Sequence, residues 1–97
     1  MMQEIDFSQA KEEGKGFQFP GEFEITALGD ASVDLPKRVP HILEGIGLHV
    51  LHETVSQRAS REGKFVSVTV SFRCENREQY DGAHAALRAD PAIRYTL

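Results

Sequence analysis

The stretch that decides the fold is residues 65–74, FVSVTVSFRC, in which apolar and polar side chains alternate along the whole length. A two-residue period is that of a β-strand with one buried face, because successive side chains point to opposite sides. The side expected to face the core carries Val66, Val68, Val70, Phe72 and Cys74. The opposite side carries Phe65, Ser67, Thr69, Ser71 and Arg73.

Upstream of this strand, residues 48–59 also look extended, and the quartet Ser60-Arg61-Glu62-Gly63 between them is rich in turn-forming residues. The two segments are therefore predicted to form an antiparallel hairpin. Apolar and polar residues mix on both sides of residues 48–59, which suits an edge strand better than a central one.

Further towards the N-terminus, residues 22–28 alternate as a half-buried strand, and residues 35–46 carry an apolar stripe at helical spacing. Asp34 is a plausible N-cap, and Gly45 and Gly47 bracket the end of the helix. Pro40 lacks a backbone donor, so the helix either starts late or is kinked there.

Downstream, Asn76 followed by Gln79 resembles a capped helix start, and Tyr80, Ala83, His84 and Leu87 share one helical face. Residues 93–97 form a short last strand, with Arg94 and Thr96 expected on the side opposite Ile93, Tyr95 and Leu97. The order β-α-β-β-α-β predicts an α+β, ferredoxin-like domain over residues 17–97. Its four-stranded antiparallel sheet should carry both helices on one face. Residues 1–16 are predicted to be a mobile tail.

Composition excludes several classes of function. The chain has 97 residues, 11 Lys and Arg against 15 Asp and Glu, a net charge of −4 and one cysteine. One domain is expected at this length, and the negative charge argues against nucleic acid as a partner. No apolar run is long enough to span a membrane, and no signal peptide is recognisable, so we expect a cytoplasmic protein without a membrane partner.

No catalytic or metal-binding constellation is visible in the sequence. His49 and His52 would point to opposite faces of a strand, and Cys74 is predicted to be a small buried hydrophobe. The loop after the first strand offers Asp30 and Asp34, which would repel a phosphate. Gly63-Lys64-Phe65 begins like an RNA-recognition motif, but hydroxyl residues follow where stacking aromatics are required. We therefore predict no enzyme activity, no metal and no cofactor.

The chain resembles the YbeD-like family of small bacterial proteins, which have an ACT-like ferredoxin fold. The resemblance covers residues 19–97 and lies in Phe19-Pro20, residues 58–69 (RASREGKFVSVT), Arg77-Glu78-Gln79 and Leu97. Members are sometimes described as lipoic acid-binding or regulatory proteins and have no agreed catalytic residues. The resemblance therefore implies a small regulatory or interaction module.

Two regions are the candidate sites. The first is the open face of the sheet, with Ser67, Thr69, Ser71 and Arg73, joined by Glu24, Thr26, Arg94 and Thr96. The second is the loop after the first strand, at Gly29 and Asp30, where glycine allows close backbone approach. The predicted function is binding of a small-molecule effector, or alternatively of a protein by sheet or strand-edge association. An ordinary solvated sheet surface explains the same residues. Because strand edges acquire partners and ACT-like domains often pair, we also expect a homodimer.

Overall fold

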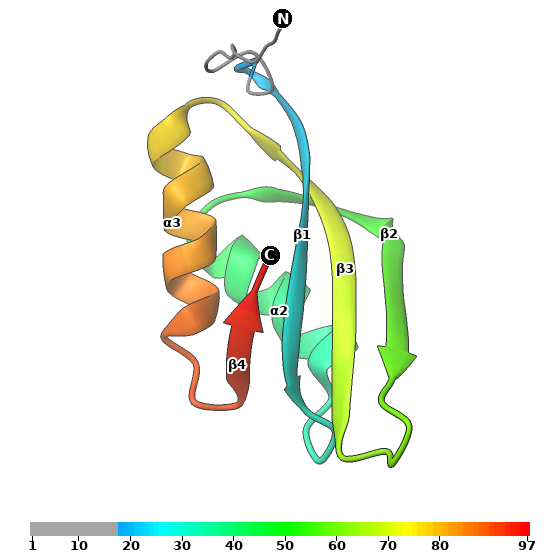
Figure 1. Ribbon diagram of the computed structural model, residues 1–97. Helices are drawn as coiled ribbons and strands as arrows, with labels where there is room; N and C mark the ends of the chain where they lie inside the picture. Colours follow the sequence, from blue (N-terminus) through cyan, green and yellow to red (C-terminus); the bar gives the residue numbers. More distant parts are fainter. Residues whose placement is uncertain (1–17) are drawn as a thin grey trace, which may run out of the picture.

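The computed structural model describes residues 18–97, and the predicted tail of residues 1–16 lies outside them. The elements are β1 (Gly21–Asp30), α2 (Leu35–Gly45), β2 (His49–Ala59), β3 (Phe65–Cys74), α3 (Arg77–Arg88) and β4 (Ile93–Thr96). The strands form one antiparallel sheet in the order β2-β3-β1-β4, and α2 passes behind β1 and β3 (Figure 1). The predicted α+β, ferredoxin-like arrangement is confirmed.

The core lies between the sheet and the two helices. Val66, Val68, Val70, Phe72 and Cys74 are all buried, as the alternation of residues 65–74 predicts. They pack with β1 and with the apolar stripes of the helices through Ile25, Ala27, Leu35, Val39, Leu43, Ala83 and Leu87. Within residues 18–97 no helix covers the other side of the sheet, so in this part of the chain its side chains form an exposed surface.

The sequence of α2 predicts where the helix begins and ends, but it does not predict that the helix continues through Pro40. The helix begins at Leu35, so the alternative of a late start is wrong, and Pro40 lies inside it. Asp34 occupies the N-cap position but makes no side-chain cap bond. At the other end, Gly47 adopts a φ of 89°, and the amides of Gly47 and Leu48 donate to the carbonyls of Glu44 and Leu43. This is a Schellman motif.

β2 lies at an edge of the sheet, as predicted, and it contains a bulge. The pairing with β3 jumps from Leu51↔Ser71 to Ser56↔Thr69, so residues 52–55 have no partners in the ladder. Within this segment the Thr54 hydroxyl accepts a 2.8 Å hydrogen bond from the Ser71 amide. The inserted residues change which face each side chain takes, which explains the poor alternation of residues 48–59.

A second irregularity corrects the prediction for the last strand. β1 pairs Leu28 with Tyr95 and Gly29 with Ile93, so Arg94 is an extra residue between them. Because a one-residue shift turns every later side chain to the opposite face, Tyr95 and Leu97 lie on the open face. Thr96, expected there, instead points towards α3, where its hydroxyl lies 3.1 Å from His84 Nδ1.

The start of α3 confirms the predicted cap. The Asn76 side chain accepts a 2.9 Å hydrogen bond from the Gln79 amide, and the Gln79 side chain accepts one from the Glu75 amide. These two bonds satisfy amides that have no partner within the helix. Within residues 18–97, no helix is long and apolar enough to cross a membrane.

Candidate functional site

Small hydroxyl side chains occupy the centre of the open face. Thr26 on β1 and Thr69 on β3 are register partners, and their hydroxyl oxygens lie 2.8 Å apart. Ser67 and Ser71 flank Thr69 on the same strand and are half-buried. The structure thus brings three predicted site residues, Ser67, Thr69 and Ser71, into one row. Short side chains leave the backbone open to close approach by another surface.

Charged pairs stand at both ends of this row. Arg73 lies 3.8 Å from Glu22, and Arg94 donates a 3.1 Å hydrogen bond to Asp30. The Arg94 guanidinium also lies over the Phe65 ring, 5.8 Å from its centroid. The predicted site residues Asp30 and Arg73 therefore belong to opposite ends of the open face.

Apolar side chains on β1, on β3 and at β4 lie on the open face, and the sequence pattern predicted only part of this set. Tyr95 is 53% exposed, Leu97 is 68% exposed and Phe65 is 37% exposed. Leu28 lies beside Tyr95 as its register partner. We call Leu28, Phe65, Tyr95 and Leu97 the apolar patch. The alternation of residues 65–74 predicts Phe65 on this face, whereas the alternation of residues 93–97 points Tyr95 and Leu97 into the core unless the bulge at Arg94 is known.

The β2 side of the same face is hollowed instead. A hollow of about 330 Å³ is lined by Ser56, Gln57, Arg58, Ser67 and Thr69. None of these side chains is large and apolar. The open face therefore protrudes at Tyr95 and Leu97 and recedes beside residues 56–58 of β2, while Leu51, nearer the start of β2, pairs with Ser71 on the same face.

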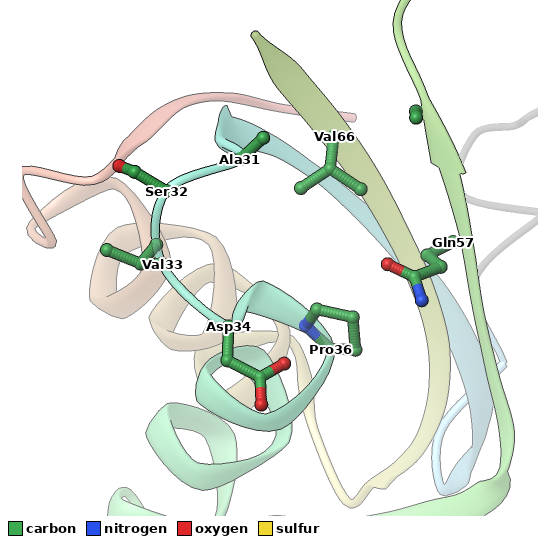
Figure 2. Close-up of a pocket in the computed structure, with 8 residues that line it drawn as sticks. Ala31, Ser32, Val33, Asp34, Pro36, Gln57 and Val66 are labelled. Carbon is green, nitrogen blue, oxygen red and sulfur yellow. The ribbon is translucent and has the colours of Figure 1, made fainter. Parts of the chain in front are cut away.

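The loop after β1 forms a separate hollow between the start of α2 and the ends of β2 and β3 (Figure 2). Its volume is about 420 Å³, and its lining is Ala31, Ser32, Val33, Asp34, Pro36, Gln57, Ala59 and Val66. Gln57 directs its amide across the opening, whereas the Ser32 hydroxyl turns away from it (Figure 2). The few polar groups do not converge on one point.

Gly29 and Asp30, the predicted residues of this loop, do not line its hollow. A Cβ at Gly29 would lie 2.3 Å from the Ala92 carbonyl oxygen and 2.8 Å from Leu35 Cδ1. Glycine is therefore required by close packing of β1 against the approach to β4. Asp30 turns its carboxylate to Arg94 on the open face.

Comparison with known proteins places the chain in a family. The family described as "Protein of unknown function (DUF493)" matches residues 15–97. The chain belongs to this family. A "UPF0250 protein" of Xanthomonas oryzae pv. oryzae is 49% identical over 82 residues, which cover 84% of this chain and 89% of the relative. The protein Smlt4048 of Stenotrophomonas maltophilia is 48% identical over the same shares of both chains. The predicted relationship to small bacterial proteins of the YbeD type is confirmed.

A solved structure shares the fold of this DUF493 family member. The uncharacterized protein TM1266 from Thermotoga maritima aligns with a TM-score of 0.54 and 13% sequence identity. The alignment covers 78% of this chain and 92% of that one. At this identity the likeness concerns the fold.

Two titratable side chains of this DUF493 member, Cys74 on the buried face of the sheet and His84 on α3, have pKa values shifted towards their neutral forms. Burial raises the pKa of the Cys74 thiol, which donates a 3.2 Å hydrogen bond to the Asn76 carbonyl. Burial, and secondarily the charge of Arg88, lowers the pKa of His84. A protonated thiol is a poor nucleophile. Among the described residues, no three His, Cys, Asp or Glu side chains gather as metal ligands.

Proposed function

We propose that the protein is a non-catalytic interaction module that binds another polypeptide through the open face of its sheet. The observation that carries this proposal is the apolar patch of Leu28, Phe65, Tyr95 and Leu97 beside a row of small hydroxyls. Tyrosine, phenylalanine and arginine are enriched in the cores of protein interfaces, and all three occur here in contact or in register.

The restricted conformation of a charged side chain, Arg94, also supports a docking surface. Arg94 is already held by Asp30 and by the Phe65 ring, so little side-chain freedom remains to be lost when a partner binds. One of the Thr26 and Thr69 hydroxyls donates to the other, so each keeps one hydrogen-bond partner when the face is covered.

A small-molecule effector at the hollow after β1 is the second candidate. It is favoured by the Asp34 carboxylate, which lines the hollow without making a cap bond, and by the Gln57 amide. Asp34 is the one charged side chain in the lining, so a neutral or cationic ligand suits this hollow better than an anion. Ligand sites bury most of the ligand against converging polar groups, and such convergence is lacking here. The open face is therefore the better-supported site.

Site-specific photocrosslinking tests the proposal directly. A benzophenone side chain placed at Thr69, in the centre of the open face, should form an adduct of discrete mass in host cells. The matched control places it at Ala85, an exposed position on the outer side of α3. An adduct at Thr69 that Tyr95→Arg abolishes supports the proposal. No adduct at Thr69, or equal adducts at both positions, would contradict it.

A thermal-shift screen separates the second candidate from the first. A ligand that binds only the folded state raises the melting temperature. If an effector binds in the loop hollow, the rise in melting temperature that it causes should be absent in Asp34→Ala and present in Tyr95→Arg. An effector that behaves in the opposite way would belong to the open face.

A further inference from the structure

We infer that the polypeptide bound by the open face is a second copy of this chain, stacked face to face about a two-fold axis that runs along the strands. This inference rests on the proposed function and names its partner. The axis lies in the interface, parallel to β1 and β3. Such a rotation brings the β4 side of one copy over the β2 side of the other, and it does so twice.

Strand register places the protruding and receding parts of the face at the same position along the strand direction. Pairing aligns residues of neighbouring strands in rows that run across the sheet, at right angles to the hydroxyl row of β3. One such row, with a residue from each of β2, β3, β1 and β4 in turn, reads Arg58, Ser67, Leu28, Tyr95. The next row reads Ser56, Thr69, Thr26, Leu97, its last pair joined by backbone bonds of 2.8 and 3.1 Å. Both rows are polar on the β2 side and end in a large apolar residue on the β4 side, whereas the following row reads Leu51, Ser71, Glu24 and does not reach β4. Rotation about an axis parallel to the strands does not change the position of a residue along the strands. Each row of one copy therefore lies over the same row of the other copy.

In the first row, Tyr95 of one copy therefore faces Arg58 of the other. A guanidinium over a tyrosine ring is attractive, and the phenol hydroxyl reaches a hollow lined by serine and threonine hydroxyls. In the second row, Leu97 faces Ser56 at the mouth of the same hollow. The protruding side of each copy thus fills the receding side of the other.

Charges on the face are complementary under the same rotation. Glu22 and Arg73 are register partners on β1 and β3, the two central strands, so the rotation places Glu22 of one copy opposite Arg73 of the other. Glu24 likewise comes opposite Ser71, which can donate its hydroxyl. A two-fold axis across the strands would instead place the two apolar β4 sides over each other and leave both hollows unfilled. The axis along the strands therefore fits the charges and the shape together.

The area of the open face indicates how tightly the dimer associates. Three strands of ten or eleven residues and the four-residue β4, at roughly 3.3 Å per residue and about 4.8 Å between strands, give about 500–600 Å² for each copy. Stable interfaces bury about 800 Å² for each partner, and smaller ones are weak. We therefore expect a dimer that dissociates in the micromolar range.

Sedimentation velocity of the full chain from about 1 to about 500 µM tests the inference. The mass should rise from 10.8 kDa towards twice that value as concentration increases. Tyr95→Arg places two guanidinium groups opposite each other in both contacts and should weaken association at least about 30-fold. Ala85→Arg adds the same charge on the outer side of α3 and should leave association unchanged.

A charge exchange gives the sharpest result. Tyr95→Arg mixed with Arg58→Glu should form a heterodimer, because one contact becomes an ion pair and the other keeps the native tyrosine and arginine. Recovery of dimer in this mixture is expected only if residues 95 and 58 face each other across the two-fold axis.

Three outcomes would overturn the inference. These are a monomer at every concentration, a dimer that Tyr95→Arg leaves intact, and a mixture that fails to recover. A dimer that survives Tyr95→Arg would point to pairing of strand edges instead. If the wild type stays monomeric while the crosslink at Thr69 still forms with a chain of another mass, the second copy is the wrong partner and the proposed function stands. If neither association nor crosslink is found, both fail.

Discussion

Two adjacent residues of β3 test the assignment of the two sheet faces. Val68 is fully buried against the helices, whereas Thr69 lies on the open face and shares a hydrogen bond with Thr26. We predict that Val68→Asp unfolds the domain and that Thr69→Asp leaves it folded. The same carboxylate is introduced in both variants, so the difference reports the face alone.

The magnitudes follow from burial. Removing the valine side chain forfeits about 1.5–3 kcal/mol of apolar burial. Burying a carboxyl group without a partner costs roughly 2–7 kcal/mol more. Together these approach the whole stability of a domain of this size, about 5–15 kcal/mol. At Thr69 the loss is at most one hydroxyl hydrogen bond, about 0.5–1.5 kcal/mol, and the new carboxylate can accept a bond from Thr26.

Circular-dichroism melting at about 1 µM chain measures both variants with self-association kept low. A loss of 1 kcal/mol shifts the melting temperature of a small domain by roughly 4–8 °C. Thr69→Asp should therefore melt within about 12 °C of the wild type, and Val68→Asp should show no cooperative transition. Equal destabilisation of the two variants would refute the assignment of faces.

Three further predictions concern stability. Gly29→Ala forces a Cβ within 2.3 Å of the Ala92 carbonyl and should cost about 1–3 kcal/mol, whereas Gly82→Ala, with nothing within 4 Å, should stabilise α3 by about 0.5–1 kcal/mol in urea titrations; the reverse order would contradict the packing of β1. The pKa of His84 is lowered in the folded state, so as pH falls the unfolded chain binds a proton at this residue at a higher pH than the folded chain does. The contribution of His84 to stability is therefore fully present above pH 6.5 and should be lost as pH decreases, and His84→Gln should reduce this dependence. An unchanged slope of stability against pH would show that His84 does not contribute. Asn76→Ala should cost about 0.5–2 kcal/mol while Asn76→Asp, which keeps the oxygen acceptor, should cost less, and equal losses would argue against the cap.

Most of the architecture follows from local patterns in the sequence. The alternation of residues 65–74 predicts the buried face of β3, and Asn76 with Gln79 predicts the start of α3, because both signals depend on neighbours in the chain. At Pro40 the alternative of a late helix start is wrong, because tertiary packing of the buried Pro40 inside α2 outweighs one missing backbone bond.

The candidate site is harder to predict because it depends on two irregularities of pairing. The extra residue Arg94 turns Tyr95 and Leu97 outward and Thr96 inward, and nothing in the sequence of β4 marks it. The bulge at residues 52–55 likewise sets which side chains of β2 border the hollow. The hydroxyl row of the open face and Phe65 were predictable from alternation alone, whereas the outward positions of Tyr95 and Leu97 required the register.

The most direct test of the central claim measures whether the open face is covered in the presence of its partner. Protein with labelled methyl groups, examined by NMR at rising concentration and then in host-cell extract, reports each surface separately. We predict that the methyl signals of Thr26, Thr69 and Leu97 shift and become protected from a soluble paramagnetic probe, while the Ala85 signal on α3 does not change. Open-face methyl groups that stay fully accessible under both conditions would contradict the claim that this face binds a polypeptide.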